Sequence, residues 1–126
     1  MNADTQSTQQ PLAQLVDSQF VELAVEVFGM LADATRVRII IALQGGELSV
    51  NTLATVIDKP APAVSQHLAK LRLARIVAAR HEGNKVYYRL ENEHASQLVS
   101  NAIDQAEHSL GGQPRHHRPT TGGVRP

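Results

Sequence analysis

Apolar side chains recur along most of this chain with the spacing of amphipathic α-helices. A first helix is predicted over 15–31, where the 3.6-residue period is followed by Val16, Phe20, Leu23, Ala24, Val27, Phe28 and Leu31. A second helix is predicted over 34–43, with the carboxylate of Asp33 as its N-terminal cap. The glycines at 45–46 should end it, because glycine adopts a left-handed backbone conformation without strain.

The stretch 50–76 indicates a short helix, a tight turn and a second helix. Ser49 is placed to cap the first helix, and Pro60 breaks the pattern because the residue before a proline is disfavoured in the α region. The second helix should bury three residues at i, i+4 and i+7, which are Val64, Leu68 and Leu71. Its opposite face carries Pro62, Gln66, Lys70 and Leu73. This is the layout of a DNA-reading helix-turn-helix, and the alternative is a surface helical hairpin in an all-α domain.

Two β-prone runs over 77–90 flank the turn-forming residues 82–84 and predict a β-hairpin. Its arms carry the basic side chains Arg80, His81, Lys85 and Arg89. A basic hairpin directly after a reading helix is typical of a wing that contacts DNA. It can also be a plain ribbon that completes the core through Val86 and Tyr88, and both interpretations can hold together.

A last helix is predicted over 92–109, with an apolar stripe of Ala95, Leu98, Val99, Ala102, Ile103 and Ala106. The polar residues 1–11 are predicted to be a disordered tail, and 111–126 a flexible, histidine-containing tail rich in glycine and proline. One winged helix-turn-helix domain, mainly α with a small β-hairpin, then occupies 12–110. The first and last helices carry more apolar surface than one small domain needs, so we expect a homodimer with both at its interface.

Charge is segregated along the chain although the formal net charge is zero. The segment 59–90 carries seven lysines and arginines against one acid, Glu82, whereas 1–34 and 91–110 carry acids and no lysine or arginine. A basic middle between acidic flanks is typical of a phosphate-contacting face on a neutral protein. The alternative is a chance cluster on a solvated surface.

Composition excludes several other classes of protein. The chain of 126 residues has no cysteine, which rules out disulfides and thiolate metal sites. No apolar run is long enough to span a membrane, and the N-terminus lacks the layout of a signal peptide, so the expected location is the cytoplasm.

The residues expected to contact double-stranded operator DNA lie on the reading helix and the wing. They are Ala63, Ser65, Gln66, His67, Lys70, Arg72, Arg80 and Lys85. Side chains early in the reading helix should meet base edges, and the basic ones should meet phosphates, which supply affinity and salt dependence. His67 serves equally as a packing residue in this scheme.

The spacing of two histidines suggests a metal site between two chains. His94 and His108 are 14 residues apart on the last predicted helix, so they point the same way within about 40° but lie about 21 Å apart. That is too far for one metal within one chain. If the helix packs antiparallel on its copy, crossing near Asn101, His94 of one chain meets His108 of the other, and the two-fold axis makes two equivalent sites.

Further candidate ligands lie close to this pair, namely Glu107, His116 and His117, with Glu93 as a weaker candidate. Imidazole and carboxylate suit Ni²⁺, Co²⁺ and Zn²⁺. A set of up to five nitrogen and oxygen donors favours six-coordinate nickel or cobalt over four-coordinate zinc, which stays as the alternative. The metal ligands predicted here are His94, Glu107, His108, His116 and His117.

The chain resembles the ArsR/SmtB family of winged-helix metal-sensing repressors over about 16–108. The matching pieces are LADATRVRIIIAL, ELSVNTLATVIDKPAPAVSQHLAKLRLARIV and YYRLENEH, and the most specific is the Ser-Gln-His-Leu-x-x-Leu pattern at 65–71. It looks closest to the family's nickel- and cobalt-sensing members, also through the PRHHR tail. The resemblance implies a homodimer that represses a metal-efflux operon and leaves DNA when metal binds.

Two departures from the family's patterns bear on the metal. The tetrahedral zinc set on the last helix matches only at His94 and His108, because Asn92 and Gln105 stand at the other two positions. The Cys-x-Cys site found in other members falls on LATVID and is absent. The first departure leaves the zinc set half missing, and the second disfavours arsenic, cadmium, lead and copper(I).

Three other functions compete with a metal-responsive repressor. The first is a winged-helix repressor with a signal other than metal, and the second is a histidine-rich metal carrier, against which the basic face argues. An enzyme is disfavoured, because Ser65 and His67 diverge on a helix and the sequence contains no phosphate loop or HExxH motif.

Overall fold

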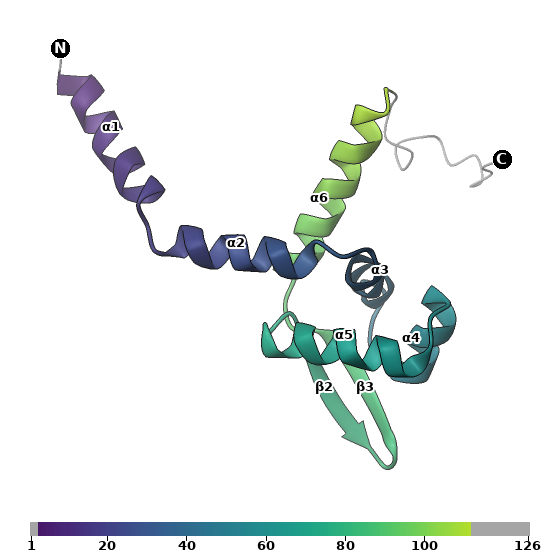
Figure 1. The fold of residues 1–126 in the computed structure, drawn as a ribbon. Helices are drawn as coiled ribbons and strands as arrows, with labels where there is room; N and C mark the ends of the chain where they lie inside the picture. The colour runs from purple at the N-terminus through teal and green to yellow at the C-terminus, as the bar shows by residue number, and fades with distance from the viewer. Residues whose placement is uncertain (1–2, 112–126) are drawn as a thin grey trace.

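The computed structural model describes residues 3–111 and shows a helical body from which a β-hairpin and two helices extend (Figure 1). The elements in chain order are α1 (Ala3–Val16), α2 (Phe20–Leu31), α3 (Ala34–Leu43), β1 (Leu48–Ser49), α4 (Val50–Ile57), α5 (Ala61–Leu73), β2 (Val77–Glu82), β3 (Lys85–Leu90) and α6 (His94–Ser109). The predicted winged helix-turn-helix is confirmed. The candidate ligands His116 and His117 lie outside the described residues.

The core lies where α3, α4, α5, β2 and α6 meet. Its fully buried side chains are Ile39, Ile40, Leu53, Val64, Leu68, Leu71 and Val77. The predicted buried face of α5 is therefore confirmed at all three positions. From α6, Ala95 and Val99 are buried, and Ile103 packs against the cluster at its edge.

The sheet has three strands in the order β1-β3-β2, all antiparallel. The predicted hairpin is confirmed, with Glu82 opposite Lys85 and Gly83 at a φ of 62° in the turn. The two-residue strand β1, whose Leu48 pairs with Tyr88, was not predicted, because it is too short to show a period.

The predicted helix over 15–31 is wrong as one continuous element. The chain breaks after Val16, where the Oγ of Ser18 accepts the backbone N–H of Phe20 at 3.0 Å. Serine side chains near a helix end compete for backbone donors in this way and favour a new helix start. The expected disordered tail over 1–11 is corrected as well, since Ala3 begins α1. Polar sequences with alanine and glutamine have adequate helix propensity, so polarity alone did not exclude a helix.

The apolar face of α2 is uncovered in the single chain. None of the residues of α2 is buried within the described structure, and Phe20 and Phe28 are 66% and 56% exposed. Val21, Leu23 and Val25 are exposed on the same helix. A surface of this composition is typical of an interface with another chain.

Candidate functional site

The turn between α4 and α5 sets the direction in which α5 leaves the core. The Oγ of Ser49 accepts the backbone N–H of Thr52 at 3.2 Å, so the predicted cap of α4 is confirmed. Asp58 ends α4 in a left-handed conformation with a φ of 56°, and the N–H of Lys59 donates to the carbonyl of Ala54 at 3.1 Å. Pro60 is extended and precedes the first turn of α5. This geometry fixes α5 as the second helix of a helix-turn-helix.

The outer face of α5 is accessible along its whole length. Ser65, Gln66, Lys70 and Arg72 are exposed, and Ala63 is half-buried. Both basic residues lie in the last turn of α5. The structure therefore places polar side chains toward the start of the helix and positive charge toward its end. This order suits base contacts first and phosphate contacts beyond them.

The tip of the wing lies beside the start of α5. A groove of about 340 Å³ has walls that include Ser65 from α5 and Asn84 and Lys85 from the hairpin. The two elements are separated in sequence, and the turn between β2 and β3 brings Asn84 and Lys85 beside Ser65. Two residues predicted to contact DNA, Ser65 and Lys85, thus share one surface.

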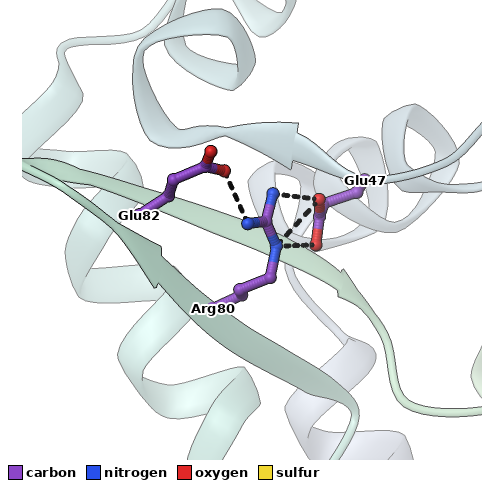
Figure 2. Close-up of polar contacts among 3 residues, drawn as sticks. All are labelled: Glu47, Arg80 and Glu82. Carbon is purple, nitrogen blue, oxygen red and sulfur yellow. Dashed lines mark hydrogen bonds and ion pairs between the residues drawn. The ribbon is translucent and has the colours of Figure 1, made fainter.

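Arg80 is held by two carboxylates on the wing (Figure 2). Its guanidinium donates to both oxygens of Glu47, with the shortest contact at 2.7 Å, and to Glu82 at 2.6 Å. It also lies over the ring of Tyr87, 4.7 Å from the ring centre. The hydrogen bonds to Glu47 and then Glu82 raise the pKa of Arg80 above its ordinary value, and the hydrogen bond from Arg80 lowers the pKa of Glu47.

This arrangement changes the electrostatics expected of the wing. Glu47 lies outside the basic segment 59–90, so counting charges along the sequence missed the acid that offsets Arg80 in space. The pairing of β1 with β3 carries Glu47 to the wing, and β1 gave no signal in the sequence. A phosphate contact by Arg80 stays a prediction, and it has to compete with two carboxylates.

His67 is half-buried on α5 and contacts α3. Its Nδ1 accepts the Nε–H of Arg36 at 3.2 Å and lies 3.8 Å from Asp33. Asp33 caps α3 by accepting the backbone N–H of Arg36 at 3.0 Å, which confirms the predicted cap. That hydrogen bond is the main reason why the pKa of Asp33 is lowered. The packing role considered for His67 is thus present, while a DNA contact stays a prediction.

The metal-ligand candidates occupy opposite ends of α6. His94 is its first residue and His108 lies in its last turn, and both side chains are exposed. A helical rise of about 1.5 Å per residue places them about 21 Å apart. Within residues 3–111 of one chain, no three or more histidine, aspartate or glutamate side chains gather closely enough to hold a metal ion. A metal site shared between two chains stays a prediction.

Two neighbouring side chains refine this picture. The Oδ1 of Asn92 accepts the backbone N–H of His94 at 2.9 Å, so Asn92 helps to start α6. Ala95, Val99 and Ile103 form a row at intervals of four residues along α6, and the half-buried Glu107 continues it. His108, the next residue, is exposed. Ligation by Glu107 stays a prediction.

Comparison with known proteins identifies the family. The family model described as "Bacterial regulatory protein, arsR family" matches residues 33–79. The HTH-type transcriptional regulator KmtR of Mycobacterium tuberculosis is 58% identical over 108 residues, which cover 86% of this chain and 82% of that protein. The chain belongs to the ArsR family. The resemblance stated from the sequence is thus confirmed.

Solved structures agree with the ArsR fold. The AntR antimony-specific transcriptional repressor matches with a TM-score of 0.71 at 29% identity, covering 78% of this chain and 89% of that one. The homodimeric winged helix-turn-helix domain Mb0332 of Mycobacterium bovis matches with a TM-score of 0.65 at 28% identity, covering 79% and 89%. The ArsR match begins at the cap of α3 and ends inside β2, so it contains the helix-turn-helix and excludes α6.

Across the described helices, we find none whose length and apolar content would let it span a bilayer.

Proposed function

We propose that this ArsR-family protein is a transcriptional repressor that binds operator DNA as a homodimer and releases it when nickel or cobalt binds α6. The observation that carries the proposal is the placement of His94 and His108, exposed at the two ends of one helix outside the DNA-reading elements. Similarity to KmtR, a transcriptional regulator, and to the antimony-specific repressor AntR supports a repressor with an inorganic signal. Release of the operator derepresses metal efflux.

The dimer brings the apolar face of α2 and the α6 helices together. In the single chain α2 exposes large apolar side chains, and α6 exposes Leu98. The homodimeric state of Mb0332 supports a homodimer here. With the two α6 helices antiparallel, His94 of one protomer lies beside His108 of its partner, and the two-fold axis makes two sites.

The donor set fits a hard or borderline divalent metal. His94 comes from one protomer and Glu107 and His108 from the other, with His116 and His117 completing the set. These are nitrogen and oxygen donors, and the sequence has no cysteine, so metals that prefer thiolate are disfavoured. Five donors suit six-coordinate Ni²⁺ or Co²⁺, and the alternative is a zinc-responsive member with fewer ligands.

DNA binding uses the surface formed by α5 and the wing. Ser65, Gln66 and Ala63 approach base edges in the major groove, and two copies of α5 span successive half-sites. Lys70, Arg72 and Lys85 contact phosphates. His67 and Arg80 stay candidates, each already hydrogen-bonded within the protein. The protein acts without catalysis, in the cytoplasm, where its DNA lies.

A DNA titration tests the proposal directly. A duplex is first selected by the wild-type protein from a random-sequence library, and its dissociation constant is then measured with and without Ni²⁺, Co²⁺ or Zn²⁺. We expect nickel or cobalt to weaken binding by about 5- to 150-fold, the usual range of allosteric coupling. Equal affinity with and without each metal would remove the sensor function and leave a repressor with another signal. A response to zinc alone would select the alternative.

Mixed dimers test whether the site lies between chains. His94→Ala and His108→Ala homodimers each lack one ligand in both sites and should lose tight nickel binding. A heterodimer of the two variants keeps one site with both histidines, while its other site has neither. We therefore expect one tightly bound nickel per heterodimer. A site built within one chain gives none, because each chain of the heterodimer lacks one histidine.

Two further variants test the rest of the ligand set. Truncation before Pro114 removes His116 and His117, and we expect the visible spectrum of the bound cobalt to lose its six-coordinate character. Glu107→Gln should weaken nickel binding about 10-fold or more, and Glu91→Gln, at an exposed carboxylate before the start of α6, is the control. An unchanged cobalt spectrum after truncation would exclude the tail from the site.

A further inference from the structure

One guanidinium joins three helices of the DNA-binding half. Arg36, in the first turn of α3, donates its Nε–H to Nδ1 of His67 on α5 at 3.2 Å. Its NH1 group donates to the carbonyl oxygen of Met30 at 3.0 Å and contacts the Sδ of the same residue at 3.1 Å. Met30 lies in the last turn of α2. The reading helix is thus tied through Arg36 to the helix with the uncovered apolar face.

The direction of this hydrogen bond determines the tautomer of His67. An arginine side chain is only a donor and keeps its charge at any ordinary pH, so Nδ1 of His67 has to carry a lone pair. In the neutral imidazole the proton then resides on Nε2. A second proton, on Nδ1, removes the acceptor and places two positive charges against each other.

The other charged groups around His67 act in opposite directions. Asp33 lies 3.8 Å from Nδ1 and favours the protonated ring, but it is engaged by the backbone N–H of Arg36. On α5 itself, Lys70 follows His67 by one turn, and its positive charge disfavours the protonated ring. Glu26 of α2 shares a groove with Lys70, where it partly offsets that charge. The geometry of the Arg36 contact therefore decides which form of His67 holds α5 in place.

We propose that His67 is a positioning residue that holds α5 against α2 through Arg36, and that its protonation weakens sequence-specific DNA binding. The inference rests on the proposed DNA-binding function and concerns orientation of the reading helix rather than a base contact. Because α2 is the helix proposed to contact the second protomer, a changed angle between α2 and α5 changes the spacing of the two reading helices in the dimer. Specific binding depends on that spacing, whereas non-specific binding to phosphates does not.

The first test uses the amide and alkyl replacements of His67. His67→Asn places its Oδ1 acceptor at the same point of the side chain as Nδ1 and cannot be protonated near neutral pH. His67→Ala removes the acceptor. At pH 7.5, with the selected duplex, we expect His67→Asn within about threefold of the wild type and His67→Ala about tenfold or more weaker, because His67→Ala loses the hydrogen bond from the charged guanidinium.

The second test is the pH profile of the ratio of specific to non-specific affinity. As the pH is lowered and imidazole ¹⁵N shifts report the protonation of His67, we expect this ratio to fall about tenfold for the wild type and less than about threefold for His67→Asn. His81→Asn, on the wing, is the matched control and should keep the wild-type pH dependence. Parallel profiles for the wild type and His67→Asn would overturn the proposal.

Imidazole ¹⁵N chemical shifts test the contact without DNA. In the full chain at pH 7.5, the shifts of His67 should show the proton on Nε2, and Arg36→Ala should raise the fraction with the proton on Nδ1, because Asp33 then lies 3.8 Å away as its acceptor. A proton on Nδ1, or no change in Arg36→Ala, would overturn the inference even where DNA binding is normal. If the library selection enriches no duplex, the proposed function fails, while the tautomer measurement still decides the role of His67.

Discussion

Gln44 joins the DNA-binding core to α6, the helix that carries the predicted metal ligands. Its Nε2 donates to Oγ of Ser96 at 2.9 Å and to Oγ of Ser100 at 3.1 Å. Gln44 directly follows Leu43, which is buried in the core, and both serines lie in the first half of α6. If metal binds α6 as proposed, a shift of this helix would be transmitted through Gln44 to the end of α3.

Gln44→Ala should reduce the effect of metal on DNA affinity. The variant loses hydrogen bonds worth about 0.5–1.5 kcal/mol each, so we expect the nickel-dependent change in DNA dissociation constant to shrink about threefold. The measurement is the same DNA titration, with and without nickel. Gln97→Ala, on α6, is the control and should keep the full metal effect. Full coupling in Gln44→Ala would show that α6 signals by another route.

Lys85 and Arg80 should contribute differently to the salt dependence of DNA binding. Each lost phosphate contact lowers the slope of log K against log salt by about 0.9, and a dimer loses two. We expect Lys85→Ala to lower the slope by about 1.8. Arg80→Ala should lower it by less, because Arg80 is already paired with Glu47 and Glu82. Affinities measured across a salt series decide this, and an equal loss in both variants would mean that Arg80 exchanges its carboxylates for phosphate.

The pair of Glu47 and Arg80 predicts a loss of stability in acid. The pKa of Glu47 is lowered below its ordinary value of 4.5, so its contribution to stability is complete above that pH and is lost as the pH falls through the folded-state pKa. Glu47→Gln lacks this contribution at every pH. The gap in stability between the wild type and Glu47→Gln should therefore narrow between about pH 5 and pH 3, as measured by urea unfolding.

Arg80→Ala supplies the control for this acid effect. In that background Glu47→Gln should have little further effect, because the partner of the carboxylate is already gone. If Glu47→Gln still lowers stability by its full amount in the Arg80→Ala background, the acid effect belongs to another partner of the carboxylate.

Truncation should destabilise the protein strongly at Leu68 and hardly at all at Leu73, although both residues lie on α5. Leu68 is fully buried, so Leu68→Ala should lower the free energy of unfolding by about 2–5 kcal/mol. Leu73 is 86% exposed, and Leu73→Ala should change the free energy of unfolding by about 0.5 kcal/mol or less. Chemical denaturation of both variants gives the comparison. A large loss in Leu73→Ala would show that the end of α5 is covered in the dimer.

Local patterns were sufficient for the DNA-binding half of the fold. The caps Asp33 and Ser49, the break at Pro60 and the buried row on α5 each depend on neighbours within one or two turns, and all were confirmed. The break after Val16 is also local, but it was missed because the apolar spacing of the chain continues across it into α2. The side chain of Ser18, which competes for the backbone N–H of Phe20, does not interrupt that spacing.

The helix-turn-helix, the hairpin and the histidine spacing on α6 could all be read from the chain, because periodicity, capping and turn chemistry act over a few residues. Packing in three dimensions selected the distant groups that meet: Glu47 with Arg80, His67 with Arg36, and Gln44 with Ser96. These contacts join residues more than thirty positions apart, and they form only where helices and strands bring them together. No repeat or spacing in the sequence predicts such a contact, because packing of the whole core determines which distant residues lie together.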